Sequence, residues 1–172
     1  MQRTIIIGDV HGCFEELLDL LDRVGATSDD RLLSVGDLVD RGPGSVSVVA
    51  HFRSLPSAVV LMGNHERKHA RGVFSYGQEI TRLQFGDAYE DARSWMQRLP
   101  YFFEDEYVRV VHAAMVPGIP LAEQKEEILC GSTAGTHTLG PLVPRPPLAR
   151  PLRRPKADRL RPSRRRQRSV RP

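Results

Sequence analysis

The chain has 172 residues, of which 40% are hydrophobic and 27% charged, as expected for one globular domain with a buried core. No apolar run approaches the roughly 20 residues of a membrane-spanning helix, and no signal-peptide pattern is present, so a cytoplasmic protein without membrane contact is expected. Residues 140–172 hold twelve basic residues and one acidic residue, whereas residues 1–139 hold thirteen basic and twenty acidic ones. The overall charge of +4 therefore does not identify the folded part as a nucleic-acid binder.

Strand and helix patterns alternate through the first third of the chain. Short apolar segments predict strands at residues 4–7, 32–35 and 58–62. Apolar side chains at helical spacing predict one helix from Phe14 to Val24 and a second that begins at Pro43. Consecutive strands joined by helices indicate an α/β fold with a parallel sheet and right-handed crossovers.

The middle of the chain is predicted to be mostly helical. Residues 65–98 have helical spacing, with breaks around Gly72 and Gly77. A further strand is predicted at residues 107–111, directly before a histidine, and a short helix at residues 121–128.

The pattern stops near residue 140, where eight prolines and eleven arginines fall within 33 residues. Such a segment cannot bury enough surface to offset its ordering entropy, so we predict a folded domain at residues 1–139 and a disordered tail at residues 140–172. A flexible segment of this charge would contact RNA or DNA non-specifically, which makes a nucleic-acid binder one alternative function.

A cluster of polar residues follows each of the three predicted parallel strands. The clusters are GDVHG after the first strand, GDLVDRG after the second and GNHE after the third. Asp9 and Asp37 are 28 residues apart, and Asp37 and Asn64 are 27 apart, each about one strand–helix–strand unit. Because ligand sites lie beyond the carboxyl ends of parallel strands, these clusters are expected to meet at one edge of the sheet.

The residue types in these clusters suit divalent cations. Carboxylate, imidazole and amide oxygen ligands together favour Mn²⁺, Fe²⁺ or Zn²⁺. Carboxylates held close together also need cations, because like charges otherwise force proton uptake. Two ions about 3.5–4 Å apart would activate a water molecule and bind both ends of an in-line displacement. Two divalent metal ions are therefore expected, with Mn²⁺ the first choice and Fe²⁺ or Zn²⁺ as alternatives.

The order and spacing of the three motifs resemble those of the calcineurin-like metallophosphoesterases, and more narrowly those of bacterial phosphoprotein phosphatases. Residues 111–118 are similar to the next block of that family, a histidine motif followed by Pro-Gly. The resemblance covers roughly residues 4–135. It implies a layered sheet sandwich with flanking helices, expected here to be incomplete on its C-terminal side.

The resemblance also implies a set of metal ligands. Asp9 and His11 would hold the first ion, and Asp37 would bridge both ions. Asn64 and His112 would hold the second ion. The implied nucleophile is a hydroxide that bridges the two ions, so no phosphoenzyme is expected.

Four further residues have implied catalytic roles. Arg41 would bind the phosphate oxygens, a task that suits its planar guanidinium group. His65 would protonate the leaving oxygen, oriented by either Asp40 or Glu66. His69 lies four residues after His65 and can share its helix face, but it matches no position of the family.

The resemblance weakens after His112. The family's second ion normally takes a further histidine from a Gly-His motif, and a second arginine normally binds the phosphate, but neither is recognisable here. The histidine that follows His112 is His137, which comes after no predicted strand. The abrupt change near residue 140 is what a reading-frame shift in a GC-rich gene would produce, a hypothesis that resequencing the gene would test.

The leading expectation is metal-dependent hydrolysis of phosphomonoesters, with phosphoserine or phosphothreonine in proteins as the substrate. A dinucleoside polyphosphate is the alternative substrate within the same fold, and GNHE rather than GNHD in the third motif favours the phosphatase slightly. A different alternative is an inactive protein that binds phosphate groups but has lost the later ligands.

Overall fold

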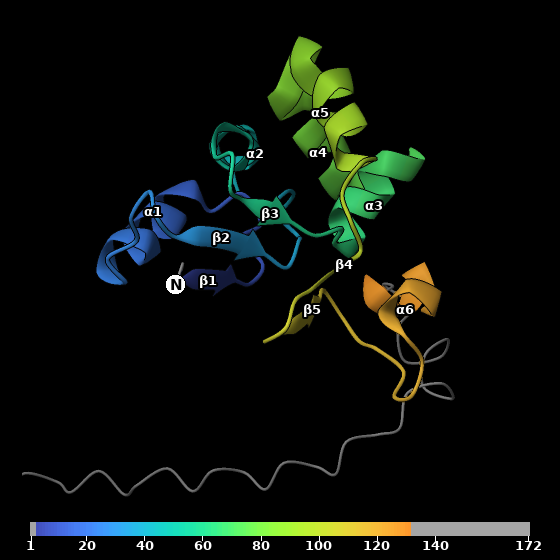
Figure 1. Ribbon diagram of the computed structural model, residues 1–172. Coiled ribbons are helices and arrows are strands. Elements are labelled where there is room, and N and C mark those ends of the chain that lie inside the picture. The colour runs from blue at the N-terminus through green and yellow to red at the C-terminus, as the bar shows by residue number, and fades with distance from the viewer. Residues whose placement is uncertain (1–2, 132–172) are drawn as a thin grey trace, which may run out of the picture.

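Three parallel strands form the sheet from which the polar motifs extend. The computed structural model describes residues 3–131. In this part of the chain the strands pair in the order β1-β2-β3, with β1 at Thr4–Ile7, β2 at Arg31–Ser34 and β3 at Val59–Val60 (Figure 1). The predicted parallel sheet is confirmed. β3 is shorter than the predicted strand at residues 58–62 because the N–H of Met62 donates to the carbonyl of Pro100, at 2.7 Å, outside the sheet.

Helices follow the strands as predicted, but their ends differ from the prediction. Their bounds are α1 at Phe14–Arg23, α2 at Ser45–Ser54, α3 at Asn64–Arg71, α4 at Tyr76–Phe85 and α5 at Tyr89–Met96. Gly72 ends α3 with a φ of 68°, which confirms the first predicted break. The second break does not fall at Gly77, because α4 already begins after Ser75, whose side chain and that of Gln78 form a capping box. The next break is a 3-10 turn at Gly86–Ala88.

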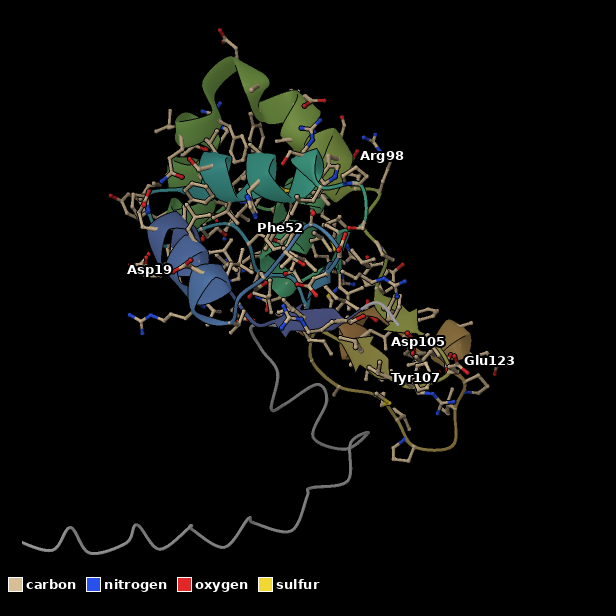
Figure 2. The ribbon with its side chains drawn as sticks, turned by 60° about the vertical axis from the view of Figure 1, so that its left-hand side comes forward. Asp19, Phe52, Arg98, Asp105, Tyr107 and Glu123 are labelled. Carbon is tan, nitrogen blue, oxygen red and sulfur yellow. The ribbon has the colours of Figure 1, made fainter. Side chains whose placement is uncertain are left out.

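The two faces of the sheet pack against different layers. Leu32 and Val60 join the core beneath the helices, where Phe52 of α2 lies almost completely buried (Figure 2). Leu33 and Leu61 face the opposite way, because side chains alternate along a strand. They pack against an antiparallel hairpin formed by β4 at Phe102–Glu104 and β5 at Arg109–Val111. Helices, sheet and hairpin are thus successive layers, which confirms the predicted layered α/β fold.

The β4–β5 hairpin was predicted only in part. β5 corresponds to the strand expected at residues 107–111, but its partner β4 was missed, because three residues are too few for an alternating pattern to be recognised. The turn of the hairpin, labelled by Asp105 and Tyr107, lies on the other side of the molecule from Asp19 of α1 in Figure 2.

The segment after β5 folds back on the loop that contains His112. The helix predicted at residues 121–128 is instead a 3-10 turn at Leu121–Glu123 and a short helix α6 at Glu126–Leu129, because Gln124 is extended between them. The N–H groups of Ala113 and Ala114 donate to carbonyl groups of α6 at 2.8 and 3.2 Å, which supports that loop. None of the helices in residues 3–131 is both long and apolar enough to cross a bilayer. The predicted boundary at residue 140 lies outside the described residues.

Candidate metal centre

The polar motifs converge at the carboxyl ends of β1, β2 and β3. The arrowheads of these strands point the same way, toward the start of α3 (Figure 1). Backbone hydrogen bonds join the loop after β1 to the loop after β2. The N–H groups of Val10 and His11 donate to the Asp37 carbonyl at 3.0 and 2.9 Å, and that of Gly12 donates to the Leu38 carbonyl at 2.8 Å. The first two motifs are therefore held side by side.

The backbone of the site is strained at functional positions. Four non-glycine residues in the described chain have positive φ angles, namely His11 at 48°, Asp37 at 53°, and Asp40 and Arg41 at 69°. Each such conformation costs about 1–3 kcal/mol and persists only where surrounding contacts enforce it. Close packing adds a further constraint, because a Cβ atom at Gly63 would overlap Asp37.

Glu66 is one of those enforcing contacts. Its buried carboxylate accepts hydrogen bonds from the N–H groups of Asp37 and Leu38, both at 2.8 Å, and from two further N–H groups at 3.3 and 3.2 Å. Glu66 was one of the two residues expected to orient His65. Its oxygens instead accept hydrogen bonds from backbone N–H groups and so stabilise the strained loop.

Glu66 and Asp37 are close enough for their carboxylates to repel each other, and a positive charge nearby would offset this repulsion. Burial raises the pKa of Glu66 to about 7, and the Asp37 carboxylate acts in the same direction against the backbone hydrogen bonds. A cation beside Asp37 would relieve this repulsion between the carboxylates.

His11 directs a buried nitrogen into the space between Asp9 and Asp37. The carbonyl of Val39 accepts a hydrogen bond from Nδ1 at 2.9 Å, so Nδ1 carries the ring proton. Nε2 is buried without a hydrogen-bond partner, 3.7 Å from an Asp9 oxygen and 3.6 Å from an Asp37 oxygen. A neutral imidazole whose tautomer is set by a backbone carbonyl is the usual form of a histidine metal ligand.

His112 is arranged in the same way on the other side of Asp37. The carbonyl of Val35 accepts from Nδ1 at 3.1 Å, which leaves a lone pair on Nε2. Nε2 lies 3.1 Å from Oδ1 of Asn64 and 3.6 Å from the second oxygen of Asp37. Two acceptors this close repel each other unless a cation lies between them. One oxygen of Asp37 thus faces His112 and the other faces His11, an arrangement that suits a bridging ligand.

The residues at this edge of the sheet fit two divalent cations. Asp9, Asp37 and His112 offer ligand atoms within 4.8 Å of one another, and so do His11, Asp37 and His65. Carboxylates, neutral imidazoles and an amide oxygen form a donor set that suits Mn²⁺, Fe²⁺ or Zn²⁺. In the second group, Nε2 of His65 lies 3.9 Å from an oxygen of Asp37. His65 was predicted as a proton donor and not as a ligand.

His65 and Arg41 lie beside this group. Oδ2 of Asp40 accepts a hydrogen bond from Nδ1 of His65 at 2.6 Å, so Nε2 faces the site. Nη2 of the exposed Arg41 lies 3.5 Å from that Nε2. Burial alone would raise the pKa of Asp40, but hydrogen bonds from His65 and three other side chains outweigh it and hold that pKa well below its usual range. Asp40 therefore remains ionised, and its carboxylate rather than that of Glu66 accepts the hydrogen bond from the His65 ring.

Sequence reasoning did not identify the three other side chains around Asp40. Nε2 of His69 donates to it at 2.9 Å and Oγ1 of Thr81 at 2.6 Å, and the amide of Gln78 donates as well. The spacing of His69 from His65 was the one available signal. Gln78 and Thr81 lie on α4, and only the packing of α4 against the site brings them to Asp40.

This fold and this set of converging motifs define a class of protein. The family model for calcineurin-like phosphoesterases matches residues 2–131, and the chain belongs to that family.

Among its relatives are proteins named as symmetrical bis(5'-nucleosyl)-tetraphosphatases. Those of Salmonella paratyphi C and Salmonella typhimurium are 37% and 38% identical, over 72% of this chain and 47% of each relative. A solved protein proposed to be a diadenosine tetraphosphatase is 32% identical with a TM-score of 0.60, over 74% of this chain and 58% of that one. The metallophosphoesterase of Sphaerobacter thermophilus is 27% identical with a TM-score of 0.54, over 66% of this chain and 47% of that one. The chain spans about half the length of the curated relatives it matches.

The family resemblance is thus confirmed, whereas its narrower form is not supported by these relatives. They are named as tetraphosphatases and not as phosphoprotein phosphatases. The GNHE motif was too small a difference to decide between them. His137 and the predicted nucleic-acid contact at residues 140–172 lie outside the described residues.

Proposed function

We propose that this chain binds two divalent cations and hydrolyses a phosphoanhydride bond in dinucleoside polyphosphates. The observation that carries the proposal is the 37–38% identity to symmetrical bis(5'-nucleosyl)-tetraphosphatases. The convergence of the predicted ligands around Asp37 supports it, because this arrangement suits an ion on each side of one carboxylate.

The ligands divide into two sets that share Asp37. Asp9 and His11 would hold one ion, and Asn64 and His112 the other. Mn²⁺ is the ion proposed first. When bound, such ions lower the pKa of a coordinated water and stabilise negative charge on phosphate oxygens.

The remaining residues have roles that their positions support. Arg41 is exposed beside His65, so its guanidinium group can bind the oxygens of an incoming phosphate. Asp40 fixes the proton of His65 on Nδ1 and directs Nε2 at the site. The protonated His65 would then donate its Nε2 proton to the leaving oxygen, while Asp40 stabilises the positive charge on the ring.

The products of hydrolysis distinguish the candidate functions. The purified chain is incubated with Mn²⁺ and P1,P4-di(adenosine-5') tetraphosphate, and in parallel with a phosphoserine peptide. Symmetrical cleavage yields two ADP molecules and no AMP, which is the expected result. Phosphate release from the peptide alone would restore the phosphoprotein phosphatase interpretation. Bound Mn²⁺ and bound nucleotide without turnover of either substrate would instead support the inactive phosphate-binding protein.

The choice of metal is tested in the same assay. Metal-free chain is loaded separately with Mn²⁺, Fe²⁺ and Zn²⁺, and ions per chain and turnover are measured for each. Highest turnover with Mn²⁺ is expected, and preferential activity with Zn²⁺ or Fe²⁺ would overturn that assignment.

A further inference from the structure

Asp40 is buried at the meeting point of two helices and the active-site loop, and four donors surround it. Its side chain is 1% exposed. Oδ2 accepts from Nδ1 of His65 and from the amide of Gln78, whereas Oδ1 accepts from Nε2 of His69 and Oγ1 of Thr81. An ionised carboxylate has about four acceptor positions, two on each oxygen. All of them are filled here, so the carboxylate cannot rotate without breaking several hydrogen bonds.

The donors are themselves held in one orientation. Nδ1 of His69 bonds to the hydroxyl group of Tyr89 on α5 at 2.8 Å, so the hydroxyl donates and Nε2 keeps the ring proton that faces Asp40. The amide oxygen of Gln78 accepts the N–H of Ser75 at 3.2 Å, as part of the cap of α4. This contact turns the amide nitrogen of Gln78 toward Asp40. Side chains from α3, α4 and α5 are therefore coupled to a single carboxylate.

We propose that His69, Gln78 and Thr81 are positioning residues for proton transfer, which act by locking Asp40 in the orientation that aims His65 at the leaving oxygen. The proposal rests on the proton-donor role of His65 in the proposed function. A backbone φ of 69° at Asp40 adds to the need for such contacts, because the loop does not favour this conformation by itself. A merely structural role would predict lower stability without any selective effect on proton donation.

Leaving-group dependence separates these two roles. Phenolate is a poor leaving group that needs a proton, whereas 4-nitrophenolate leaves readily without one. Thr81→Val removes one donor to Asp40, and Thr81→Ser retains it. For Thr81→Val, kcat on phenyl phosphate is expected to fall about tenfold with KM within about twofold, and kcat on 4-nitrophenyl phosphate to fall by less than about threefold. Thr81→Ser should restore both. An equal loss on both substrates, or no rescue by serine, would overturn the proposal.

A second pair of variants tests the donor from α3. His69→Leu removes the donor, and His69→Gln can place an amide nitrogen near the position of Nε2. His69→Leu is expected to show the same selective fall in kcat on phenyl phosphate, and His69→Gln is expected to recover part of it. Ile80→Ala is the control for the Thr81 variants, because it changes a residue of the same helix, α4, that is 40% exposed; it should leave the ratio of the two kcat values unchanged.

An NMR measurement tests the positioning without turnover. In the metal-free full chain, the Nδ1 proton of His65 should give a slowly exchanging downfield signal, identified by its loss in His65→Gln. Solvent exchange of this proton should be at least about tenfold faster in Thr81→Val and His69→Leu, and unchanged in Thr81→Ser. Unaltered exchange in both of the first two variants would contradict the positioning role. If the loaded wild-type chain hydrolyses neither aryl phosphate nor P1,P4-di(adenosine-5') tetraphosphate, the proposed function fails, while the exchange rates still decide whether Asp40 is locked.

Discussion

Replacing Asp37 by asparagine separates the charge of this side chain from its shape. The side chain is 3% exposed, and its Oδ1 accepts the backbone N–H of His65 at 2.9 Å, a bond that the asparagine carbonyl can keep. The variant also removes a negative charge next to Glu66. We therefore expect metal-free Asp37→Asn to fold and to be at least as stable as the wild-type chain in urea.

Metal affinity should change in the opposite direction. The Nε2 atoms of His11 and His112 lie 3.6 Å from the two oxygens of Asp37, so a cation held by either imidazole is close to this charge. Two unit charges about 4 Å apart attract by about 4 kcal/mol at an effective dielectric constant of 20. Since each 1.4 kcal/mol is a factor of ten, losing the Asp37 charge should weaken cation binding at least about a thousandfold.

Titration calorimetry with Mn²⁺, together with metal analysis after dialysis, measures this loss. Asp19→Asn is the matched control, because it removes the same charge from an exposed position on α1. Asp19→Asn should bind two ions per chain with wild-type affinity. Retention of two ions at near wild-type affinity in Asp37→Asn would refute the bridging role. A strongly destabilised metal-free Asp37→Asn chain would instead refute the view that Asp37 and Glu66 repel each other.

Three further changes test other parts of the molecule. His65→Asn should lower kcat on phenyl phosphate by about 10²–10⁴-fold and leave the metal content unchanged; loss of an ion would make His65 a ligand. Arg41→Ala should lower kcat/KM on aryl phosphates by about 10–100-fold, because a hydrogen bond to a charged group contributes about 1.5–3 kcal/mol, and an unchanged value would exclude Arg41 from phosphate binding. Leu33→Ala, at a completely buried residue between sheet and hairpin, should cost about 2–5 kcal/mol in urea unfolding, and a loss under about 1 kcal/mol would show that the two layers do not share a core.

The parallel sheet could be predicted because each strand is a short apolar run and each crossover contains an amphipathic helix. The errors fall where tertiary contacts decide the ends of elements. α2 begins at Ser45, two residues after Pro43, because the N–H of Gly44 donates to the carbonyl of Gly12 in the first motif. β4 exists only through its pairing with β5, so its sequence by itself gives little indication of a strand.

The convergence of the candidate ligands could be predicted for a similar reason. Asp9, Asp37 and Asn64 each follow a strand, and parallel strands bring such positions together. The contacts around Asp40 could not, because they depend on how three helices pack. Glu66 is the instructive case, since its place in the motif suggested proton chemistry. Its oxygens are in fact taken up by backbone N–H groups of the strained loop.

The described residues supply three protein donors to each proposed ion. These are Asp9, His11 and Asp37 for one ion, and Asp37, Asn64 and His112 for the other. Catalytic zinc sites, for comparison, commonly have three protein ligands and leave a position for water or substrate. Residues 113–131 contain neither histidine nor arginine, so a further ligand or phosphate contact of the family type does not come from that segment.

Metal binding and turnover should therefore depend on different residues of the described part of the chain. We expect two Mn²⁺ ions per chain in equilibrium dialysis, because each proposed ion has two donors of its own and shares the charged carboxylate of Asp37. Turnover depends in addition on binding of the phosphate, for which Arg41 is the one predicted arginine. One ion per chain, retained in His11→Ala but lost in His112→Ala, would contradict this expectation. It would mean that the first set does not hold an ion although its imidazole nitrogen is buried and without a partner.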